Sequence, residues 1–295
     1  MKTIALELVP PEIDGGEQRA VEEGQKVARV AEETGLSGAI KHVMIPGMIA
    51  EEDDRPVELK PRMDVLDFWQ RLRPELPDMR GLCTQVTAFD AKPQLTDRLN
   101  ALRTAGMDGI TFVGVPRTMA DGDGPGMAPT DALAEFTGIV PNRGVILIPT
   151  REGEHGRFNF KCNQGATYAM TQLLFSDSIV DFLRDFAKQT DHRPDVLLSF
   201  GFVPGIEKKI GLIDWLIQDP GNRVVKEEQE FVARLAESSF AEKKRELVEL
   251  YKRVIDQVAD LGFEISIHLE APYGVSNPAF ETFAEMLDYY SPVSF

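Results

Sequence analysis

Two patterns of hydrophobic positions alternate along the chain. Short apolar or β-branched runs predict buried strands, and longer stretches with apolar residues every three to four positions predict amphipathic helices. The predicted strands cover residues 3–8, 38–44, 81–86, 109–113, 144–148, 166–170, 196–200 and 263–269. The predicted helices cover residues 18–34, 65–73, 94–106, 130–137, 176–189, 206–218, 243–261 and 280–289. This order is typical of parallel βα units.

Eight such units predict a fold of the α/β class, a (β/α)8 TIM barrel that forms a single domain over residues 1–295. An open doubly wound sheet is the alternative if the first and last strands do not pair. The interval between the seventh and eighth predicted strands is long, so we expect an extended crossover with an extra helix at about residues 227–236.

Charge and composition exclude several classes of partner. With 32 Lys and Arg against 48 Asp and Glu, the net charge is −16, which opposes nucleic acid and anionic membrane surfaces. No apolar run approaches the roughly 20 residues of a membrane helix, and the opening MKTIALELVPPE lacks the pattern of a secretion signal. The two cysteines, Cys83 and Cys162, favour a reducing cytoplasm. The oligomeric state stays open, with a homo-oligomer among the alternatives.

In a barrel, residues at the carboxyl ends of the strands converge on one rim. The polar, glycine or aromatic residues predicted there are Glu7, His42, Gln85, Thr87, Gly114, Arg117, Thr150, Arg151, Gln172, Phe202, His268 and Glu270. Glu7 lies in an apolar strand, where burial raises a carboxyl pKa and makes a proton donor. Its alternative is an outward-facing or Lys-paired carboxylate. The Gln172 amide, among apolar neighbours, can bind a ring edge, and a satisfied buried amide is its alternative.

The remaining polar segments are interpreted as loops and not as catalytic or metal sites. His155 lies near Glu152 and Glu154 in a segment interpreted as a solvated loop, and we predict no metal site. Residues 119–129 (MADGDGPGMAP) are interpreted as a lid. The motifs of a Rossmann cofactor domain, a P-loop, a zinc hydrolase and a hydrolase elbow are missing from the sequence.

The strand-end residues resemble those of the methylenetetrahydrofolate reductases, a family of (β/α)8 barrels, over most of the chain. Residues 6–11 (LELVPP) resemble the FEFFPP strand of that family, with Glu7 at its catalytic glutamate. Residues 167–177 (TYAMTQLLFSD) resemble its ITQFFFD segment, with Gln172 at the pterin-binding glutamine. Residues 201–204 (GFVP) resemble its GILP. Residues 83–93 (CTQVTAFDAKP) resemble its HLTCIDATP, where Gln85 replaces a histidine.

Two departures concern the flavin. Flavin-dependent members carry RGD after the fourth strand, whereas this chain reads FVGVPRT, with Pro116 in place of the aspartate. Their histidine-containing segment after the fifth strand is replaced by IPTREGEHG. The chain is therefore similar to the shorter, flavin-independent actinobacterial branch, which implies that FAD is absent and that a nicotinamide cofactor reduces the folate directly.

The resemblance implies a cytoplasmic reductase that converts 5,10-methylenetetrahydrofolate to 5-methyltetrahydrofolate with NADH or NADPH. We expect Glu7 as proton donor, and Gln172, Gln85, His268 and Phe202 at the substrate. Residues expected at the cofactor, where arginines suit its phosphates, are Arg117, Arg151 and Gly114. The alternatives are an FAD-dependent reductase and a folate- or corrinoid-linked methyltransferase, and the choice between NADH and NADPH stays open.

Overall fold

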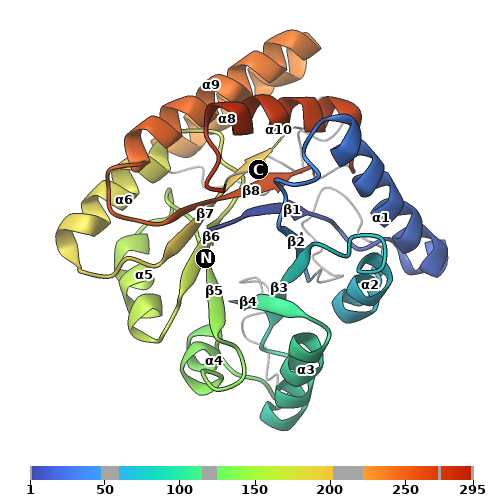
Figure 1. The fold of residues 1–295 in the computed structure, drawn as a ribbon. Coiled ribbons are helices and arrows are strands. Elements are labelled where there is room, and N and C mark those ends of the chain that lie inside the picture. The colour runs from blue at the N-terminus through green and yellow to red at the C-terminus, as the bar shows by residue number, and fades with distance from the viewer. Residues whose placement is uncertain (1, 48–59, 115–124, 202–221, 272–273, 294–295) are drawn as a thin grey trace.

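Eight parallel strands pair in chain order and close into a barrel, because β1 also pairs with β8 (Figure 1). The computed structural model describes residues 2–47, 60–114, 125–201, 222–271 and 274–293. The strands are β1 (Ile4–Glu7), β2 (His42–Ile45), β3 (Arg80–Val86), β4 (Met107–Val113), β5 (Asn142–Leu147), β6 (Tyr168–Thr171), β7 (Asp195–Gly201) and β8 (Ile265–Glu270). The predicted TIM barrel is confirmed.

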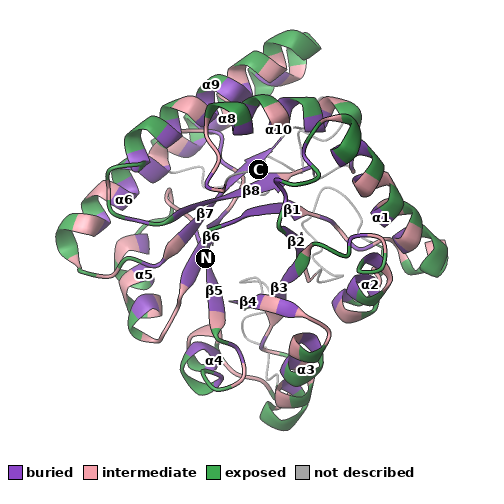
Figure 2. Ribbon diagram, in the orientation of Figure 1, coloured by how far each residue is buried: buried purple, intermediate pink, exposed green. Residues whose placement is uncertain are grey.

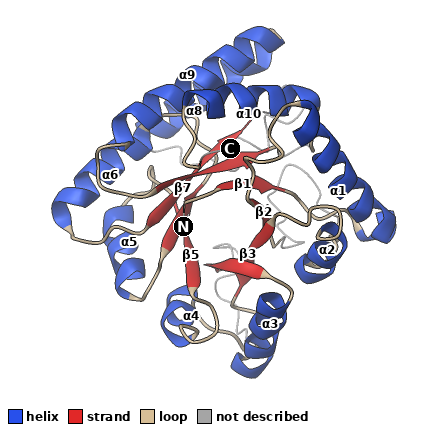
Figure 3. Ribbon diagram, viewed as in Figure 1, coloured by secondary structure: helices blue, strands red, loops and turns tan. Residues whose placement is uncertain are grey.

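Helices surround the strands on the outside of the barrel (Figure 3). They are α1 (Gly16–Glu33), α2 (Val65–Leu72), α3 (Lys92–Thr104), α4 (Pro129–Glu135), α5 (Glu154–Asn163), α6 (Ser178–Gln189), α8 (Arg223–Glu237), α9 (Phe240–Val258) and α10 (Asn277–Tyr289). Helix α8 confirms the extra helix predicted at residues 227–236. The predicted helix 206–218 lies outside the described residues.

Buried residues make up most of the barrel strands (Figure 2), and the buried apolar residues form two clusters. The larger cluster lies between the strands and the helices and includes Trp69, Phe158 and Phe280. A smaller cluster fills the barrel interior and consists of Ala5, Met44, Leu82, Tyr168, Met170 and Leu197. Successive side chains of a strand point to opposite faces, so residues two positions from a member of this cluster also face the interior. This alternation identifies the strand side chains that point into the barrel.

The predicted start of the second strand is wrong by four residues. The segment before His42 contains the apolar Ala39 and Ile40, but both of their amides donate to the carbonyl of Leu36 and form a turn. Pairing with β1 begins only when the Lys41 amide donates to the Ile4 carbonyl. His42 therefore lies at the amino end of its strand, opposite to the rim where it was expected.

His42 is held at this amino end by hydrogen bonds on both ring nitrogens. Its Nδ1 lies 2.6 Å from the Thr3 hydroxyl, and its Nε2 lies 3.3 Å from Asp108, which also pairs with Arg80. Burial lowers the pKa of His42, and the nearby Asp108 opposes this shift. His42 is therefore a satisfied structural residue.

Four of the described helices, α2, α8, α9 and α10, begin at side-chain caps. The Asp64 carboxylate accepts from the Leu66 amide at 2.8 Å and starts α2. Ser239 and Glu242 form a reciprocal capping box at the start of α9. Such caps satisfy amides that have no partner within the helix.

Of the helices that the structure describes, none combines the length and the apolar character needed to cross a membrane.

The barrel interior supplies a stability test at Tyr168. Its ring is 1% exposed, and its hydroxyl lies 2.8 Å from that of Thr111. We expect Tyr168→Phe to lower the free energy of unfolding by about 1–3 kcal/mol, because it leaves the buried Thr111 hydroxyl unsatisfied. Urea denaturation measures this change. Adding Thr111→Val should restore part of the loss, and a fully additive double variant would show that the hydrogen bond contributes nothing.

Candidate active site

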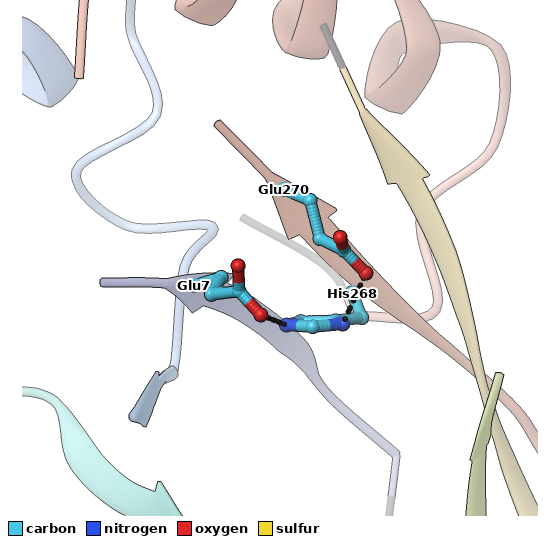
Figure 4. A group of neighbouring side chains, drawn as sticks. All are labelled: Glu7, His268 and Glu270. Atoms are coloured by element: carbon cyan, nitrogen blue, oxygen red, sulfur yellow. Dashed lines mark ion pairs between the residues drawn. The ribbon is translucent and has the colours of Figure 1, made fainter. Parts of the chain in front are cut away.

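Three polar side chains meet inside the carboxyl end of the barrel (Figure 4). Glu7 ends β1, and His268 and Glu270 lie in β8. Ala5 packs in the interior cluster, so Glu7 two residues later faces the same side. The Glu7 Oε2 atom lies 3.9 Å from His268 Nε2, and Glu270 Oε1 lies 3.3 Å from His268 Nδ1. The closure of β1 on β8 thus brings the two ends of the chain to one site.

Burial makes Glu7 an unusual carboxyl group. Its pKa lies well above the ordinary value of 4.5, mainly because burial disfavours the charged form, and secondly because of the negative charge of Glu270. The side chain keeps 16% of its surface exposed. Glu7 is therefore a carboxylic acid that retains its proton at a higher pH than a surface glutamate and can still be reached at the rim.

A hydrogen-bond network extends from His268 to the two neighbouring strands. The Ser199 hydroxyl of β7 lies 2.8 Å from His268 Nδ1 and 2.8 Å from the Thr171 carbonyl of β6. The Ser199 amide also donates to the Thr171 hydroxyl at 2.9 Å. His268 is 1% exposed, and its Nε2 is buried without a hydrogen-bond partner. One ring nitrogen of His268, Nδ1, therefore has a hydrogen-bond partner, and the other, Nε2, has none.

The same three side chains carry the atom types that bind cations. One ligand atom from each of Glu7, His268 and Glu270 lies within 4.8 Å of the other two. Ligand atoms about 2.0–2.2 Å from a zinc ion lie roughly 3.3 Å from one another, and the Glu7–His268 separation of 3.9 Å is wider than this. A cation would also require Glu7 to lose the proton that burial favours. A zinc ion would therefore need both a closer approach of the ligands and the loss of this proton.

Gln172 lies directly after β6, next to the same network. Its side chain is half-buried, and the loop that carries it is tied to the barrel by the Leu174 amide, which donates to the Ser199 carbonyl at 3.0 Å. The Ser176 hydroxyl donates to Glu228 of α8 at 2.5 Å. Burial raises the pKa of Glu228, and the hydrogen bond from Ser176 opposes this shift. The long crossover therefore holds the Gln172 loop in place.

Gln85 lies apart from this group. It lines a cavity of about 690 Å³ with Arg62, Arg98 and Phe89, and neither Glu7 nor Gln172 lines that cavity. The Gln85 amide is engaged at both ends, because its nitrogen donates to the Val86 carbonyl at 2.8 Å and its oxygen accepts from Arg98 at 3.4 Å. Arg98 in turn forms a two-bond ion pair with Asp64.

The residues expected at a cofactor fall into two groups. Gly114 is exposed just after β4, and Arg151 is 44% exposed beyond β5, with its guanidinium 3.7 Å from Glu154. Arg117, like Phe202 of the substrate group, lies outside the described residues, as does most of the predicted lid. The structure therefore brings Glu7, His268 and Glu270 together, with Gln172 beside their network, and places Gln85 on a cavity that these residues do not line.

The segment around His155 differs from its prediction as a solvated loop. It forms α5, where Glu154 is 1% exposed and bonds to Lys161 at 2.9 Å. The His155 ring stacks on Phe182 with centroids 4.2 Å apart. The segment is an amphipathic helix that packs on α6, and its many charged residues had suggested a loop. Sequence reasoning also missed Ser199 and Glu228, whose only signal is a polar side chain at a buried position of a strand or helix.

Known structures with the same fold include two proteins of low sequence identity. A protein from Clostridium thermocellum, described as binding two copies of 5-methyl-5,6,7,8-tetrahydrofolic acid, aligns with a TM-score of 0.67 and 16% identity. The alignment covers 97% of this chain and 93% of that one. The long-chain alkane monooxygenase LadA aligns with a TM-score of 0.52 and 10% identity, over 96% and 89% of the two chains. These similarities support the fold alone.

Sequence comparison gives the family. No curated protein matches the chain. The family model for mycobacterial methylenetetrahydrofolate reductase matches residues 1–294, which is nearly the whole sequence. The chain therefore belongs to the mycobacterial methylenetetrahydrofolate reductase family.

Proposed function

We propose that this protein reduces 5,10-methylenetetrahydrofolate to 5-methyltetrahydrofolate, with NADH or NADPH as the direct hydride donor and Glu7 as the proton donor. The buried acid Glu7 at the carboxyl end of β1 is the observation that carries the proposal. Family membership supports the folate substrate. The tetrahydrofolate described for the Clostridium thermocellum protein of the same fold agrees with it.

The chemistry requires an acid at this place. The methylene carbon of the substrate joins two nitrogens, and a proton from Glu7 goes to one of them as its bond to carbon breaks. The electron pair of that bond stays on the protonated nitrogen, and the carbon becomes an iminium cation with the other nitrogen. The Glu7 carboxylate then stabilises this cation. A bound nicotinamide supplies the hydride that converts the iminium carbon to a methyl group.

Gln172 is proposed to hold the pterin edge, because its amide offers both a donor and an acceptor. Phe202 is proposed at the substrate from the motif alone. Gln85 can reach the substrate only if its bonds to Val86 and Arg98 open. His268 is 1% exposed, so its proposed contribution to substrate binding passes through Glu7.

For the cofactor, Arg151, Arg117 and Gly114 are the proposed contacts, and the Arg151 guanidinium lies 3.7 Å from the buried Glu154. The absence of FAD is proposed from Pro116, which stands where flavin-dependent members have an aspartate. Both cysteines are free and buried, and burial raises the pKa of each thiol to about 12. Such unpaired, unreactive thiols support a cytoplasmic location.

The first test is an anaerobic assay of the purified chain without added flavin. We expect loss of nicotinamide absorbance in the presence of methylenetetrahydrofolate and formation of an equal amount of 5-methyltetrahydrofolate. NADH and NADPH are compared in parallel. A flavin spectrum that survives gel filtration would contradict the flavin-free proposal. Methyl transfer to a thiol without nicotinamide oxidation would favour the methyltransferase.

Glu7→Gln tests the acid. We expect turnover to fall by about 10²–10⁴-fold, because an amide cannot supply the proton. The wild-type kcat/KM should fall as pH rises through the raised pKa of Glu7, since only the protonated form is active. The control is Glu32→Gln, an exposed carboxyl of α1. Near-normal turnover of a folded Glu7→Gln variant would remove Glu7 from this role.

Although Glu7→Gln should lower turnover, it should raise the stability of the folded protein at neutral pH. The folded protein holds the Glu7 proton more tightly than the unfolded chain, so wild-type stability falls as pH rises from about 4.5 toward the raised pKa. Glu7→Gln has no such loss. We expect its unfolding midpoint in urea to exceed that of the wild type at neutral pH and to match it more closely at about pH 4. A less stable variant at neutral pH would contradict the assignment of a raised pKa.

Gln172→Ala tests the pterin contact. We expect 5-methyltetrahydrofolate to bind about tenfold more weakly, because two hydrogen bonds to the ring edge are lost. Titration calorimetry measures the affinity, and Gln189→Ala, at the exposed end of α6, is the matched control. Equal folate affinity in the two variants would show that Gln172 does not hold the pterin.

A further inference from the structure

The position of the ring proton on His268 follows from its neighbours. The Ser199 hydroxyl has a single hydrogen, and the Thr171 carbonyl 2.8 Å away can only accept it. The Ser199 oxygen is then an acceptor for His268 Nδ1, also at 2.8 Å. Glu270 places a second acceptor oxygen 3.3 Å from the same nitrogen. Two acceptors around Nδ1 require the hydrogen to be there, so the neutral ring carries Nδ1–H.

The other ring nitrogen is therefore a bare acceptor. His268 Nε2 is buried and has no hydrogen-bond partner, a state that costs about 1–3 kcal/mol for a polar group. The Glu7 Oε2 atom lies 3.9 Å away, about 1 Å beyond a hydrogen bond. A small rotation of the Glu7 side chain, which is not fully buried, would close this gap. The hydrogen of the Glu7 carboxylic acid is the donor that fits.

We propose that His268 is a positioning residue for Glu7: Ser199 and Glu270 hold its Nδ1–H, and its Nε2 lone pair accepts the Glu7 hydroxyl hydrogen and keeps the acid protonated and oriented. This inference rests on the proposed function, because it assigns how the acid of that reaction is kept ready. His268 contributes no atom to the substrate. It acts through Glu7 alone.

The charges around the pair agree with this role. The Glu7–His268 pair lies on β1 and β8, and the titratable neighbour on these strands is Glu270. The neighbouring strands contribute neutral residues: Ser199 on β7 contacts His268, and Met44 on β2 pairs with Glu7. In the part of the chain that the structure describes, neither carboxylate forms an ion pair with Lys or Arg. An ionised Glu7 would therefore face a lone pair on one side and the negative Glu270 beyond it. Both favour recapture of a proton after each turnover.

His42 supplies a matched control within the same barrel. It is also a buried strand histidine beside a threonine hydroxyl and an acidic residue. Both of its nitrogens have partners, Thr3 and Asp108, and neither of these belongs to the group of Glu7, His268 and Glu270. Replacing His42 therefore tests the loss of a buried histidine without touching the acid.

The experiment compares His268→Asn, His268→Gln and His42→Asn. The Asn amide can replace Nδ1–H toward Ser199 but has no atom at the Nε2 position, whereas the Gln amide extends to that position. We expect His268→Asn to move the pH midpoint of kcat/KM downward by about 1 unit, equivalent to one lost hydrogen bond. His268→Gln should recover part of the shift, and His42→Asn should leave the midpoint unchanged.

A ligand-free measurement separates this inference from the proposed function. The Glu7 carboxyl is titrated by carbon NMR in labelled protein and assigned with Glu7→Gln, and the ring nitrogens of wild-type His268 are assigned by nitrogen NMR. Support requires Nδ1–H with bare Nε2 and a lower Glu7 midpoint in His268→Asn. A protonated Nε2, or an unchanged Glu7 titration in the folded variant, overturns the proposal. A wild type with this NMR signature but no folate reduction overturns only the proposed function.

If His268→Asn does not fold, Ser199→Ala replaces it, because it removes one of the two acceptors at Nδ1 and leaves the imidazole in place. We then expect a mixture of the two ring tautomers and a lower Glu7 midpoint. An unchanged tautomer and an unchanged midpoint in this variant would also overturn the role of the network.

Discussion

The pairing of the first strand with the last is the interaction on which the site depends. The Thr3 amide donates to the Ser266 hydroxyl at 3.0 Å, the Ile267 amide donates to the Thr3 carbonyl, and Ala5 lies opposite His268. Without this closure the acid at the start of the chain and the histidine near its end would be separate. In an open sheet Glu7 would lie at an edge and meet water. Barrel closure therefore creates both the proximity and the burial that change Glu7 from a surface carboxylate into an acid.

The site is also joined to the substrate side by strand-to-strand hydrogen bonds. Ser199 links His268 of β8 to Thr171 of β6, and Gln172 follows Thr171 directly. The loop of the residue proposed to hold the pterin is thus connected through two buried hydroxyls to His268, which lies 3.9 Å from the proposed acid Glu7. A fixed geometry of this kind matters because proton transfer requires heavy atoms within hydrogen-bond distance. The interior polar groups, which weaken a purely apolar core, serve that alignment.

Sequence patterns were sufficient for the architecture and for part of the site. Eight strands could be placed because buried parallel strands are short apolar runs, and Glu7 was found because a carboxylate interrupts one of them. The patterns could not separate a buried turn from a strand at Ala39 and Ile40, so His42 was placed at the wrong end. They also could not show that Gln85 is engaged by Arg98, because this contact depends on how α3 packs beside β3. Local composition reports burial, but partners across strands depend on register.

The two strand histidines show why hydrogen-bond partners decide function. His42 and His268 lie beside β1 on its two sides, and both pair with Ala5. At the amino end, Thr3 and Asp108 satisfy both nitrogens of His42, and Arg80 neutralises Asp108. In contrast, only one nitrogen of His268 is satisfied, and the other faces an acid that has no basic partner within the described residues. An identical side chain is structural where its hydrogen bonds are complete. It can act on a neighbouring proton where one hydrogen bond is left open.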